Sequence, residues 1–289
     1  MKKKTWIAGA AVLAAVLLFC IWQNNDLTVS RSQVLSQWLP AEFDGFTIVQ
    51  ISDLHNKNFG QGQERILKAI AETEPDLIVI TGDMIDSRRT DVEPALNFAE
   101  GVAKLAPCCY VSGNHESRVP EAYAALKRGL TEAGAAVLEN EKTVLERNGG
   151  AISLLGVSDP TFQTGYILGD DVSVMKDQLE TLTDEGDGYT VLLSHRPELF
   201  DVYVNAGVDL VFTGHAHGGQ WRLPGVGGLI APGQGFFPQY TSGAHTAIAC
   251  GETGSRETVM YVSRGLGNSL MPIRIFNRPE IVVVELCRK

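Results

Sequence analysis

The amino-acid sequence predicts an α/β fold, in which helices cover β-sheets, preceded by one membrane-spanning helix. In the first half of the chain, short runs of β-branched and apolar residues alternate with segments whose apolar residues recur at helical spacing. In the second half, segments rich in turn residues separate further apolar runs. An unbroken apolar run near the N-terminus accounts for the additional helix.

The N-terminal segment, residues 1–25, combines a basic start with a long apolar run. Lys2, Lys3 and Lys4 precede the run WIAGAAVLAAVLLFCIW at residues 6–22, which as a helix would be about 25 Å long. A tryptophan at each end suits the membrane–water interfaces, and the lysines favour the cytoplasm. We therefore expect an uncleaved single-pass anchor in the cell membrane, with the catalytic domain on the extracytoplasmic side. A cleaved signal peptide is the alternative, although no small-x-small cleavage site follows the run.

The charge of the chain is unevenly distributed. The 24 basic and 34 acidic residues give a net charge of −10 over 289 residues. Three of the basic residues and none of the acidic ones lie in residues 1–25, so the remainder holds 21 basic and 34 acidic residues, a net charge of −13. A hydrophobic content of 44% excludes a disordered chain. Because no basic stripe is present, we expect no sequence-specific binding of nucleic acid.

The first half of the chain after the anchor shows regular alternation. Residues 26–45 are expected to form a polar connector, and residues 46–289 a single domain without internal repeats. Strands are predicted at 46–53, 76–83 and 108–114, and helices at 62–73, 92–105 and 120–134. In the first helix, Ile66 and Ile70 share one face, and the helix must end before Pro75. Alternation of this kind predicts a sheet with helices on its faces.

The second half of the domain contains further strands and many turns. Apolar runs that are typical of strands cover 151–159, 190–198, 208–221, 261–267 and 279–287. Residues 218–254 are rich in Gly, Pro, Ser and Thr, which favours loops and short hairpins. The five cysteines lack CxxC spacing and predict neither a disulfide framework nor a structural zinc site. We expect Cys108 and Cys109 to be small residues of the core.

Side chains able to bind metal ions gather where the predicted strands end, and five of the six histidines lie there. The groups are Asp53-Leu54-His55, Gly82-Asp83-Met84-Ile85-Asp86, Gly113-Asn114-His115-Glu116, Ser194-His195-Arg196-Pro197 and Gly214-His215-Ala216-His217. In α/β folds, strand ends at one edge of a sheet form ligand sites. A two-residue spacing is expected to place Asp53 and His55 on the same side of their strand, and likewise His215 and His217.

The candidate ligands are Asp53, His55, Asp83, Asn114, His195, His215 and His217. This set is too large for one tetrahedral zinc ion, and its mixture of nitrogen and oxygen atoms suits Zn, Fe or Mn better than Ca. Two ions about 3.5–4 Å apart that share a carboxylate would use all seven. The sequence therefore predicts a binuclear centre of two divalent or trivalent ions.

The five groups, in order between residues 53 and 217, resemble the signature of calcineurin-like metallophosphoesterases. The resemblance implies a β-sandwich flanked by helices. It implies that Asp53, His55 and His217 bind one ion, that Asn114, His195 and His215 bind the other, and that Asp83 bridges both. It further implies that a hydroxide held between the ions attacks phosphorus. His115 would be the catalytic residue that faces the substrate, where it stabilises the developing charge or protonates the leaving oxygen.

A narrower resemblance rests on the anchor, the motifs SDLH, SHRPE and GHAHGGQ, and the late segment VSRGLGNSLMPIR. This combination is similar to bacterial membrane-associated phosphoesterases, among them cell-envelope phosphodiesterases and UDP-2,3-diacylglucosamine pyrophosphatases. The resemblance implies hydrolysis of phosphodiester or pyrophosphate bonds, with phosphate esters or lipid-linked pyrophosphates as substrates. We expect the Arg264-Gly265-Leu266-Gly267 turn and Arg274 of the late segment near the substrate opening. An extracytoplasmic domain disagrees with a role in lipid A synthesis, in which this hydrolysis is cytoplasmic.

Two other functions fit the same residues. The chain is alternatively a protein Ser/Thr phosphatase of this superfamily, or a non-catalytic metal-binding scaffold of the same fold. A scaffold is expected to have lost ligands or His115, and all are present. Of the neighbouring residues, Asp86 is expected to hold its loop through backbone amides, Glu116 either supports the site from behind or is solvated, and Arg196 is expected to be a solvated turn residue. No feature of the sequence predicts an oligomeric state.

Overall fold

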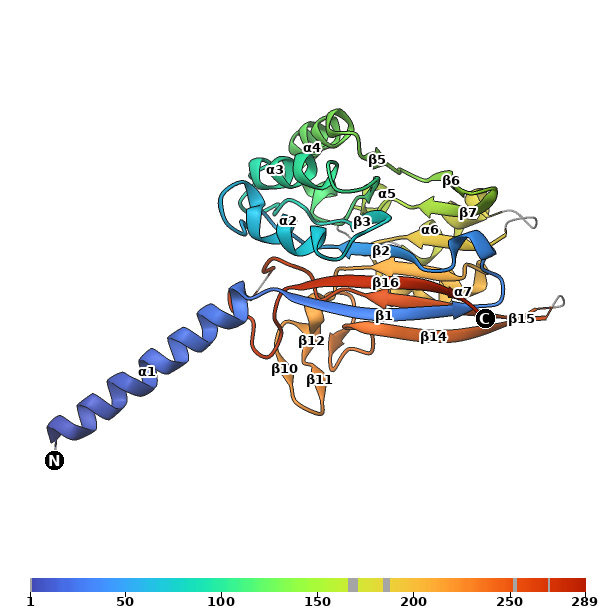
Figure 1. The fold of residues 1–289 in the computed structure, drawn as a ribbon. Helices are drawn as coiled ribbons and strands as arrows, with labels where there is room; N and C mark the ends of the chain where they lie inside the picture. Colours follow the sequence, from blue (N-terminus) through green and yellow to red (C-terminus); the bar gives the residue numbers. More distant parts are fainter. Residues whose placement is uncertain (1, 166–170, 184–187, 252–253, 270) are drawn as a thin grey trace.

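A long helix leads out of a body made of two stacked β-sheets (Figure 1). The computed structural model describes residues 2–165, 171–183, 188–251, 254–269 and 271–289. Each sheet has six strands, and helices cover the outer face of each. The architecture confirms the predicted α/β class and its β-sandwich flanked by helices.

The first sheet has the strand order β1-β16-β2-β3-β4-β5. Its strands are β1 (Thr28–Ser36), β16 (Glu280–Arg288), β2 (Phe46–Ile51), β3 (Leu77–Thr81), β4 (Cys108–Val111) and β5 (Ala136–Val137). β2 to β5 run parallel to one another, β16 runs antiparallel to β2, and β1 runs parallel to β16. Helices α2 (Glu64–Ala71), α3 (Glu93–Val102) and α4 (Pro120–Ala133) cover its outer face.

The second sheet has the order β14-β15-β9-β8-β7-β6. Its strands are β14 (Gly243–Gly251), β15 (Gly254–Val262), β9 (Leu210–Thr213), β8 (Thr190–Leu193), β7 (Gly150–Gly156) and β6 (Glu141–Arg147). β15, β9, β8 and β7 are parallel, and β14 and β6 pair antiparallel at the two edges. Helices α6 (Asp171–Leu182) and α7 (Phe200–Asn205) pack on the outer face, and the short α5 (Thr161–Thr164) follows β7.

The core between the sheets explains the continuous apolar runs of the sequence. Ile48 and Val79 from the first sheet meet Val191 and Phe212 from the second, and all four are fully buried. Parallel strands that are covered on both faces lose the polar positions that an exposed face would carry. The two cysteines of β4 follow this rule: Cys108 points to the helices and Cys109 to the other sheet. Both are buried, as predicted, and burial raises the pKa of Cys109 to about 11.

The predicted elements are present, with two corrections. Residues 28–36 of the expected connector form β1, which continues the first sheet. Of the strand expected at 261–267, only Tyr261 and Val262 are in a strand; the following residues form a loop. Leu266 N–H donates to the carbonyl of Ser52 at 3.1 Å, so this loop closes over the end of β2. Helices α5, α6 and α7 and strands β5, β6 and β14 were not predicted. The nine residues of β14 lie in 218–254, where loops and short hairpins were expected.

Helix α1 (Lys2–Asn25) is long and apolar enough to cross a membrane. Trp6–Asn25 has a mean hydropathy of 2.1, and only 6% of it is buried against the body. Its last residues nevertheless belong to the body: Gln23 is buried, and its side-chain oxygen accepts a hydrogen bond from Asn277 N–H at 3.1 Å. Such a helix is compatible with a single-pass membrane protein.

Candidate metal centre

The carboxyl ends of the central strands of both sheets meet at the end of the body from which α1 leaves (Figure 1). Loops after β2, β3 and β4 carry Asp53, His55, Asp83, Asn114 and His115, and loops after β8 and β9 carry His195, His215 and His217. All eight side chains belong to residues that are buried. The structure therefore brings together every residue predicted for the site.

The first group of ligand atoms comes from Asp53, His55, Asp83 and His217, and these atoms all lie within 4.8 Å of one another. The Nε2 atoms of His55 and His217 are 3.1 Å apart. His217 Nε2 lies 3.3 Å from Asp53 Oδ1, and His55 Nε2 lies 3.6 Å from Asp83 Oδ2. Two carboxylates and two imidazoles thus converge on one point.

The second group contains Asp83, His195 and His215, so Asp83 belongs to both. His195 Nε2 lies 3.2 Å from Asp83 Oδ2 and 3.2 Å from His215 Nδ1. The other ring nitrogen of His195, Nδ1, donates to the carbonyl of Thr81 at 2.7 Å. This hydrogen bond fixes the ring and leaves Nε2 as the nitrogen that faces Asp83. Asn114 lines the same cavity beside Asp83 and His215.

Both groups suit a cation. Burial lowers the pKa of His55 to about 3 despite the nearby Asp83, and burial also lowers the pKa of His217 well below its usual range. The two Nε2 atoms, 3.1 Å apart, form a hydrogen bond when one of them carries the ring proton, and with both protons on Nδ1 their two lone pairs can bind one metal ion. At His195, burial lowers the pKa but Asp83 raises it to about 10, so a proton occupies a position that a cation can take.

The backbone around the ligands is unusual. Five of the seven predicted ligands have positive φ: Asp53 (54°), His55 (47°), Asp83 (52°), His215 (64°) and His217 (48°). The expectation that strand alternation places each Asp or His pair on one side is therefore wrong. The residues follow the strands in left-handed turns, and the turns aim both members of each pair at the centre.

Two glycines are required by close approach. A Cβ on Gly113 would lie 2.3 Å from Asp83 Oδ1, and one on Gly214 would lie 1.9 Å from Ser52 Oγ and 2.4 Å from Asp53 Oδ2. At both glycines the backbone therefore passes close to the site. What the backbone approaches is a ligand carboxylate.

Glu116 supports the centre from behind. It is fully buried, and its carboxylate accepts hydrogen bonds from the backbone N–H groups of Asp83, Met84, Ile85 and Gly113 at 2.8–3.2 Å. One side chain thus ties the loop after β3 to the loop after β4. The sequence left open whether Glu116 supports the site from behind or is solvated, and its burial shows that it is not solvated. Asp86 holds its loop as predicted, because its Oδ1 accepts from Arg88 N–H at 2.9 Å.

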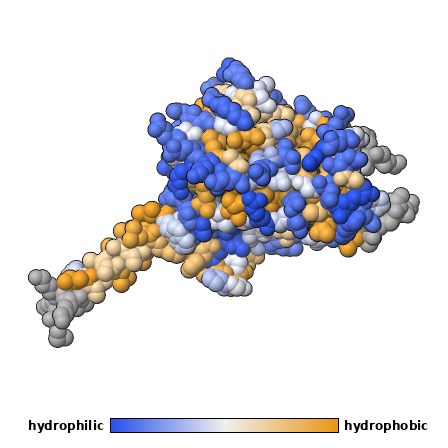
Figure 2. Space-filling view, in the orientation of Figure 1, coloured by the Kyte–Doolittle hydropathy of each residue, from blue (hydrophilic) through white to orange (hydrophobic). Residues whose placement is uncertain are grey.

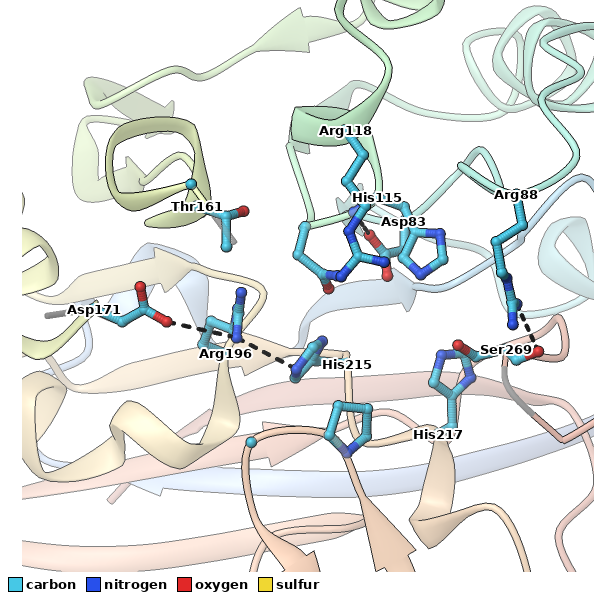
Figure 3. A pocket seen from close by; sticks show the side chains of 14 residues that line it. Asp83, Arg88, His115, Arg118, Thr161, Asp171, Arg196, His215, His217 and Ser269 are labelled. Atoms are coloured by element: carbon cyan, nitrogen blue, oxygen red, sulfur yellow. Dashed lines mark hydrogen bonds and ion pairs between the residues drawn. The ribbon is translucent and has the colours of Figure 1, made fainter. Parts of the chain in front are cut away.

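His115 lies at the edge of the two groups and lines the cavity (Figure 3). Ser87 N–H points at its Nδ1 at 3.1 Å. Because a backbone N–H can only donate, Nδ1 must accept, and the ring proton is on Nε2. Burial lowers the pKa of His115, which agrees with a neutral ring. His115 is therefore a neutral hydrogen-bond donor at the wall of the cavity.

The cavity above the ligands has a volume of about 550 Å³ and is open to solvent. Arg88, Arg118 and Arg196 line it together with Asp83, His115, His215 and His217 (Figure 3). Arg88 donates to Asp86 Oδ1 and to the carbonyl of Ser269, so it bridges the opening from the loop after β3 to the late segment. Three guanidinium groups place positive charge on this wall, and two of them are paired with carboxylates, Arg88 with Asp86 and Arg196 with Asp159.

Arg196 is not the solvated turn residue that was predicted. This residue is buried, and its guanidinium pairs with both oxygens of Asp159, Nε to Oδ2 at 2.5 Å and Nη2 to Oδ1 at 3.0 Å. Its Nη1 also lies 3.2 Å from Glu198 Oε1 and 3.5 Å from His215 Nε2. The sequence contained an indication of this ion pair, because Asp159 lies at the end of a predicted strand, the same position that the candidate ligands occupy.

Most of the late segment lies behind the ligands, whereas its Ser269 reaches the opening. A Cβ on Gly265 would be 2.7 Å from Asp53 Cβ. Arg274 is buried, and it donates to the carbonyl of Arg264 at 3.0 Å and to Asn268 Oδ1 at 3.1 Å. Of the segment's described residues, Ser269 alone lines the cavity. The expected role of these arginines at the substrate opening is therefore corrected to one of holding the loop.

Comparison with known proteins gives a consistent result. The family model for calcineurin-like phosphoesterases matches residues 46–219. The chain is 33% identical over 273 residues to the uncharacterized metallophosphoesterase YkuE of Bacillus subtilis (strain 168), a match that covers 91% of this chain and 87% of that protein. It is 31% identical over 251 residues to the phosphodiesterase YaeI of Escherichia coli (strain K12), covering 83% and 82%.

A further relative carries a more specific description. The UDP-2,3-diacylglucosamine pyrophosphatase LpxG of Chlamydia muridarum (strain MoPn / Nigg) is 27% identical over 338 aligned positions. The match covers 96% of each chain.

Proposed function

The chain belongs to the calcineurin-like phosphoesterase family and is a metal-dependent phosphoester hydrolase; from this premise we propose that it is a membrane-anchored, binuclear enzyme that cleaves phosphodiester or pyrophosphate bonds of lipid-linked substrates. One observation carries the proposal. Two groups of ligand atoms share Asp83 at the floor of an open cavity whose wall holds three arginines.

We assign the ligands to two ions. Asp53, His55 and His217 would hold one ion, Asn114, His195 and His215 would hold the other, and Asp83 belongs to both groups of ligand atoms. When bound, the two ions supply a water nucleophile at neutral pH and neutralise charge on the phosphoryl oxygens. Ser52 Oγ donates to Asp53 Oδ2 at 2.5 Å, and Thr81 holds His195, so neighbouring groups orient ligands in each half of the centre.

His115 acts on the leaving group. Its Nδ1 is occupied by Ser87 N–H, so Nε2–H is the group available to a substrate in the cavity. A donor at this position stabilises negative charge on the departing oxygen and can transfer its proton to it. No serine or cysteine nucleophile is required, because the bound ions would supply a water nucleophile. Cys108 and Cys109 are buried in the core.

The shape and charge of the cavity favour a substrate larger than a phosphate monoester. A volume of about 550 Å³ is in the range of sites for drug-sized ligands. Arg88 and Arg118 lie on the His115 side of the cavity and offer positive charge for a second anionic group, as in a pyrophosphate. The described relatives YaeI, a phosphodiesterase, and LpxG, a pyrophosphatase of a lipid precursor, support the same substrate classes.

The test is the substitution Asp83→Asn, which keeps the size of the side chain and removes the charge shared by both groups. We expect the purified variant to bind at most one metal ion per chain and to lose hydrolysis of bis(p-nitrophenyl) phosphate by a factor of at least about 10³. Asp91→Asn is the matched control, since Asp91 is exposed and lies outside the site. Full turnover with Asp83→Asn would contradict the assignment. Preference of the wild-type enzyme for phosphoserine peptides over diesters and lipid pyrophosphates would favour the protein phosphatase instead.

A further inference from the structure

Exposed apolar side chains gather on two segments beside α1. Outside α1, the structure describes fifteen large apolar side chains that are exposed, and seven of them lie on residues 221–237 and 273–276. We call these seven the apolar rim: Trp221, Leu223, Val226, Phe236, Phe237, Ile273 and Phe276. Phe236 and Phe237, 78% and 70% exposed, are the two most exposed members of the fifteen.

The two segments form one continuous surface. Trp221 bridges Ile275, and the indole N–H of Trp221 donates to the carbonyl of Ile273 at 2.9 Å. Strands β10 (Arg222–Leu223) and β11 (Gly227–Gly228) form a small hairpin that carries Val226 at its turn. Strands β12 (Ile230–Ala231) and β13 (Gly235–Phe236) form the next hairpin. Leu229 N–H donates to Trp221 carbonyl and Phe237 N–H to Leu229 carbonyl, both at 2.9 Å, which joins the two hairpins.

The apolar rim continues the surface of α1. The ring of Phe276 packs edge-on against Phe19 of α1, with 5.5 Å between ring centroids. Arg278 lies over the ring of Trp22 at 5.2 Å. Figure 1 shows β10 and β11 projecting from the body near the base of α1. In Figure 2 the apolar surface of the helix continues onto the body where the helix joins it.

Two exposed aromatic residues of the apolar rim have strained backbone conformations. Phe237 and Phe276 have positive φ, 53° and 51°, a conformation that bulky side chains rarely adopt. Both remain exposed, so burial in the described part of the chain does not offset the strain. Strain of this kind is found where the surroundings, or a ligand, over-determine the conformation.

The charge of these segments differs from that of the body. Residues 221–250 contain Arg222 and no acidic residue, and residues 264–278 contain Arg264, Arg274 and Arg278 and no acidic residue. The remainder of the chain after the anchor is strongly acidic. Of these arginines, Arg274 is buried, Arg264 pairs with Glu280 and Arg278 pairs with Asp26. Exposed apolar side chains on segments that carry no acidic residue favour a membrane interface.

We infer that the apolar rim is a second membrane contact, which rests in the headgroup region of the same bilayer that α1 crosses. The inference depends on the proposed anchoring by α1, which brings the rim to the bilayer surface. The turn between β12 and β13 contributes Pro232 and Gly233 to the wall of the metal cavity. Docking of the rim therefore holds the cavity at the level of lipid headgroups. The substrate class that fits is a membrane lipid whose phosphoester stays at the interface while its chains remain in the bilayer.

The test is photolabelling of the full-length protein in nanodiscs of phosphatidylcholine and phosphatidylglycerol (3:1) that contain a diazirine-bearing phosphatidylcholine. Peptide mass spectrometry then locates the label. We expect label in α1 and in peptides that contain residues 221–237 and 273–276, and at least five-fold less in the peptide of β6. Label in α1 alone would overturn the docking but leave the anchoring and the enzymatic proposal standing. Label in neither would overturn both the docking and the anchoring.

A variant pair makes the result specific. Phe236→Ser with Phe237→Ser should reduce labelling of residues 221–237 at least five-fold, while hydrolysis of soluble bis(p-nitrophenyl) phosphate stays within two-fold of wild type. Ile248→Ser on β14, which removes another side chain that is 60% exposed, is the matched control and should leave labelling unchanged. Retained labelling of the double variant would show that these two residues do not contact lipid and would count against the inference.

Discussion

At the scale of single residues, the site combines strained ligands with a rigid support. Each left-handed non-glycine residue costs roughly 1 kcal/mol or more, and five proposed ligands adopt this conformation. Glu116 is the main support, because four backbone N–H groups from two loops donate to one carboxylate. The ligands are thereby held in place before any ion binds, and the loops do not need to rearrange around it.

The substitution Glu116→Gln tests this support. In the variant, the amide nitrogen of the new side chain would replace one of the carboxylate oxygens that accept from backbone N–H groups in the wild type. Because this nitrogen cannot accept, buried N–H donors would lose their acceptor. We expect the free energy of unfolding to fall by about 3 kcal/mol, measured by urea denaturation with metal chelated. Glu132→Gln, an equivalent change at an exposed position of α4, should stay within about 0.5 kcal/mol of wild type. An equally small effect at Glu116 would contradict the supporting role.

The substitution His115→Gln separates catalysis from metal binding. Loss of the Nε2–H donor should lower kcat by a factor of about 10²–10⁴ while the metal content, measured by plasma emission spectrometry, stays unchanged. His245→Gln is the matched control, because His245 lies in β14 away from the cavity. A parallel loss of metal and activity would instead make His115 a ligand.

At the scale of elements, the loops after adjacent strands are joined by ion pairs. Asp159 follows β7 and Arg196 follows β8, and their bidentate contact is buried. The contact fixes the loop that carries His195, and Arg196 in turn touches Glu198 and His215. The ion pair therefore fixes the position of the loop after β8 relative to the loop after β7, and with it one half of the proposed centre.

Asp159→Asn should destabilise the protein by about 3 kcal/mol at pH 7, because it leaves a buried guanidinium without its carboxylate. Burial raises the pKa of Asp159, but Arg196 lowers it further, so the net shift is downward. The stabilisation is complete above the unfolded value of 3.8 and is lost as the pH falls through the folded value. Stability of the variant should consequently fall less steeply below pH 4. Asp201→Asn, at an exposed position of α7, should leave both quantities unchanged.

Strand β1 shows why one element was missed. Its side chains alternate between exposed and half-buried positions, and Val34 alone among them is buried. Such an edge strand lacks the apolar run by which the other strands were predicted. It is held by parallel pairing with β16 and by the contact of Ser30 Oγ with Glu280 Oε1 at 2.5 Å. Both depend on residues about 250 positions later.

At the scale of the whole molecule, helix α1 and the candidate metal centre are connected. Asn277 is not a proposed ligand, but it contacts both parts. Its side-chain amide donates to the carbonyl of His217 at 2.7 Å, and its backbone N–H donates to the side chain of Gln23. The end of α1 thus packs behind a proposed ligand. A soluble form of the protein should begin at Gln23 rather than Asp26, since the shorter chain would lose this contact.

We propose that the charge at the N-terminal end of α1 sets the topology. Lys2, Lys3 and Lys4 favour a cytoplasmic N-terminus, so proteinase K added to intact spheroplasts should digest the body. A tag at the C-terminus, followed by immunoblotting, reports the digestion, and a cytoplasmic marker protein serves as the control. Protection of the body until detergent is added would reverse the proposed orientation.

The sequence by itself determined the fold class, the family and the identity of the candidate ligands. It did so because parallel strands buried on both faces need continuous apolar runs, and because polar residues that end such runs stand out from them. The tertiary structure alone decided how those residues meet. Left-handed turns, not strand alternation, aim Asp53, His55 and His217 at one point. Contacts between residues distant in the chain decide the roles of Glu116 and Arg196, the presence of β1 and the assembly of the apolar rim. Local sequence patterns do not predict such contacts.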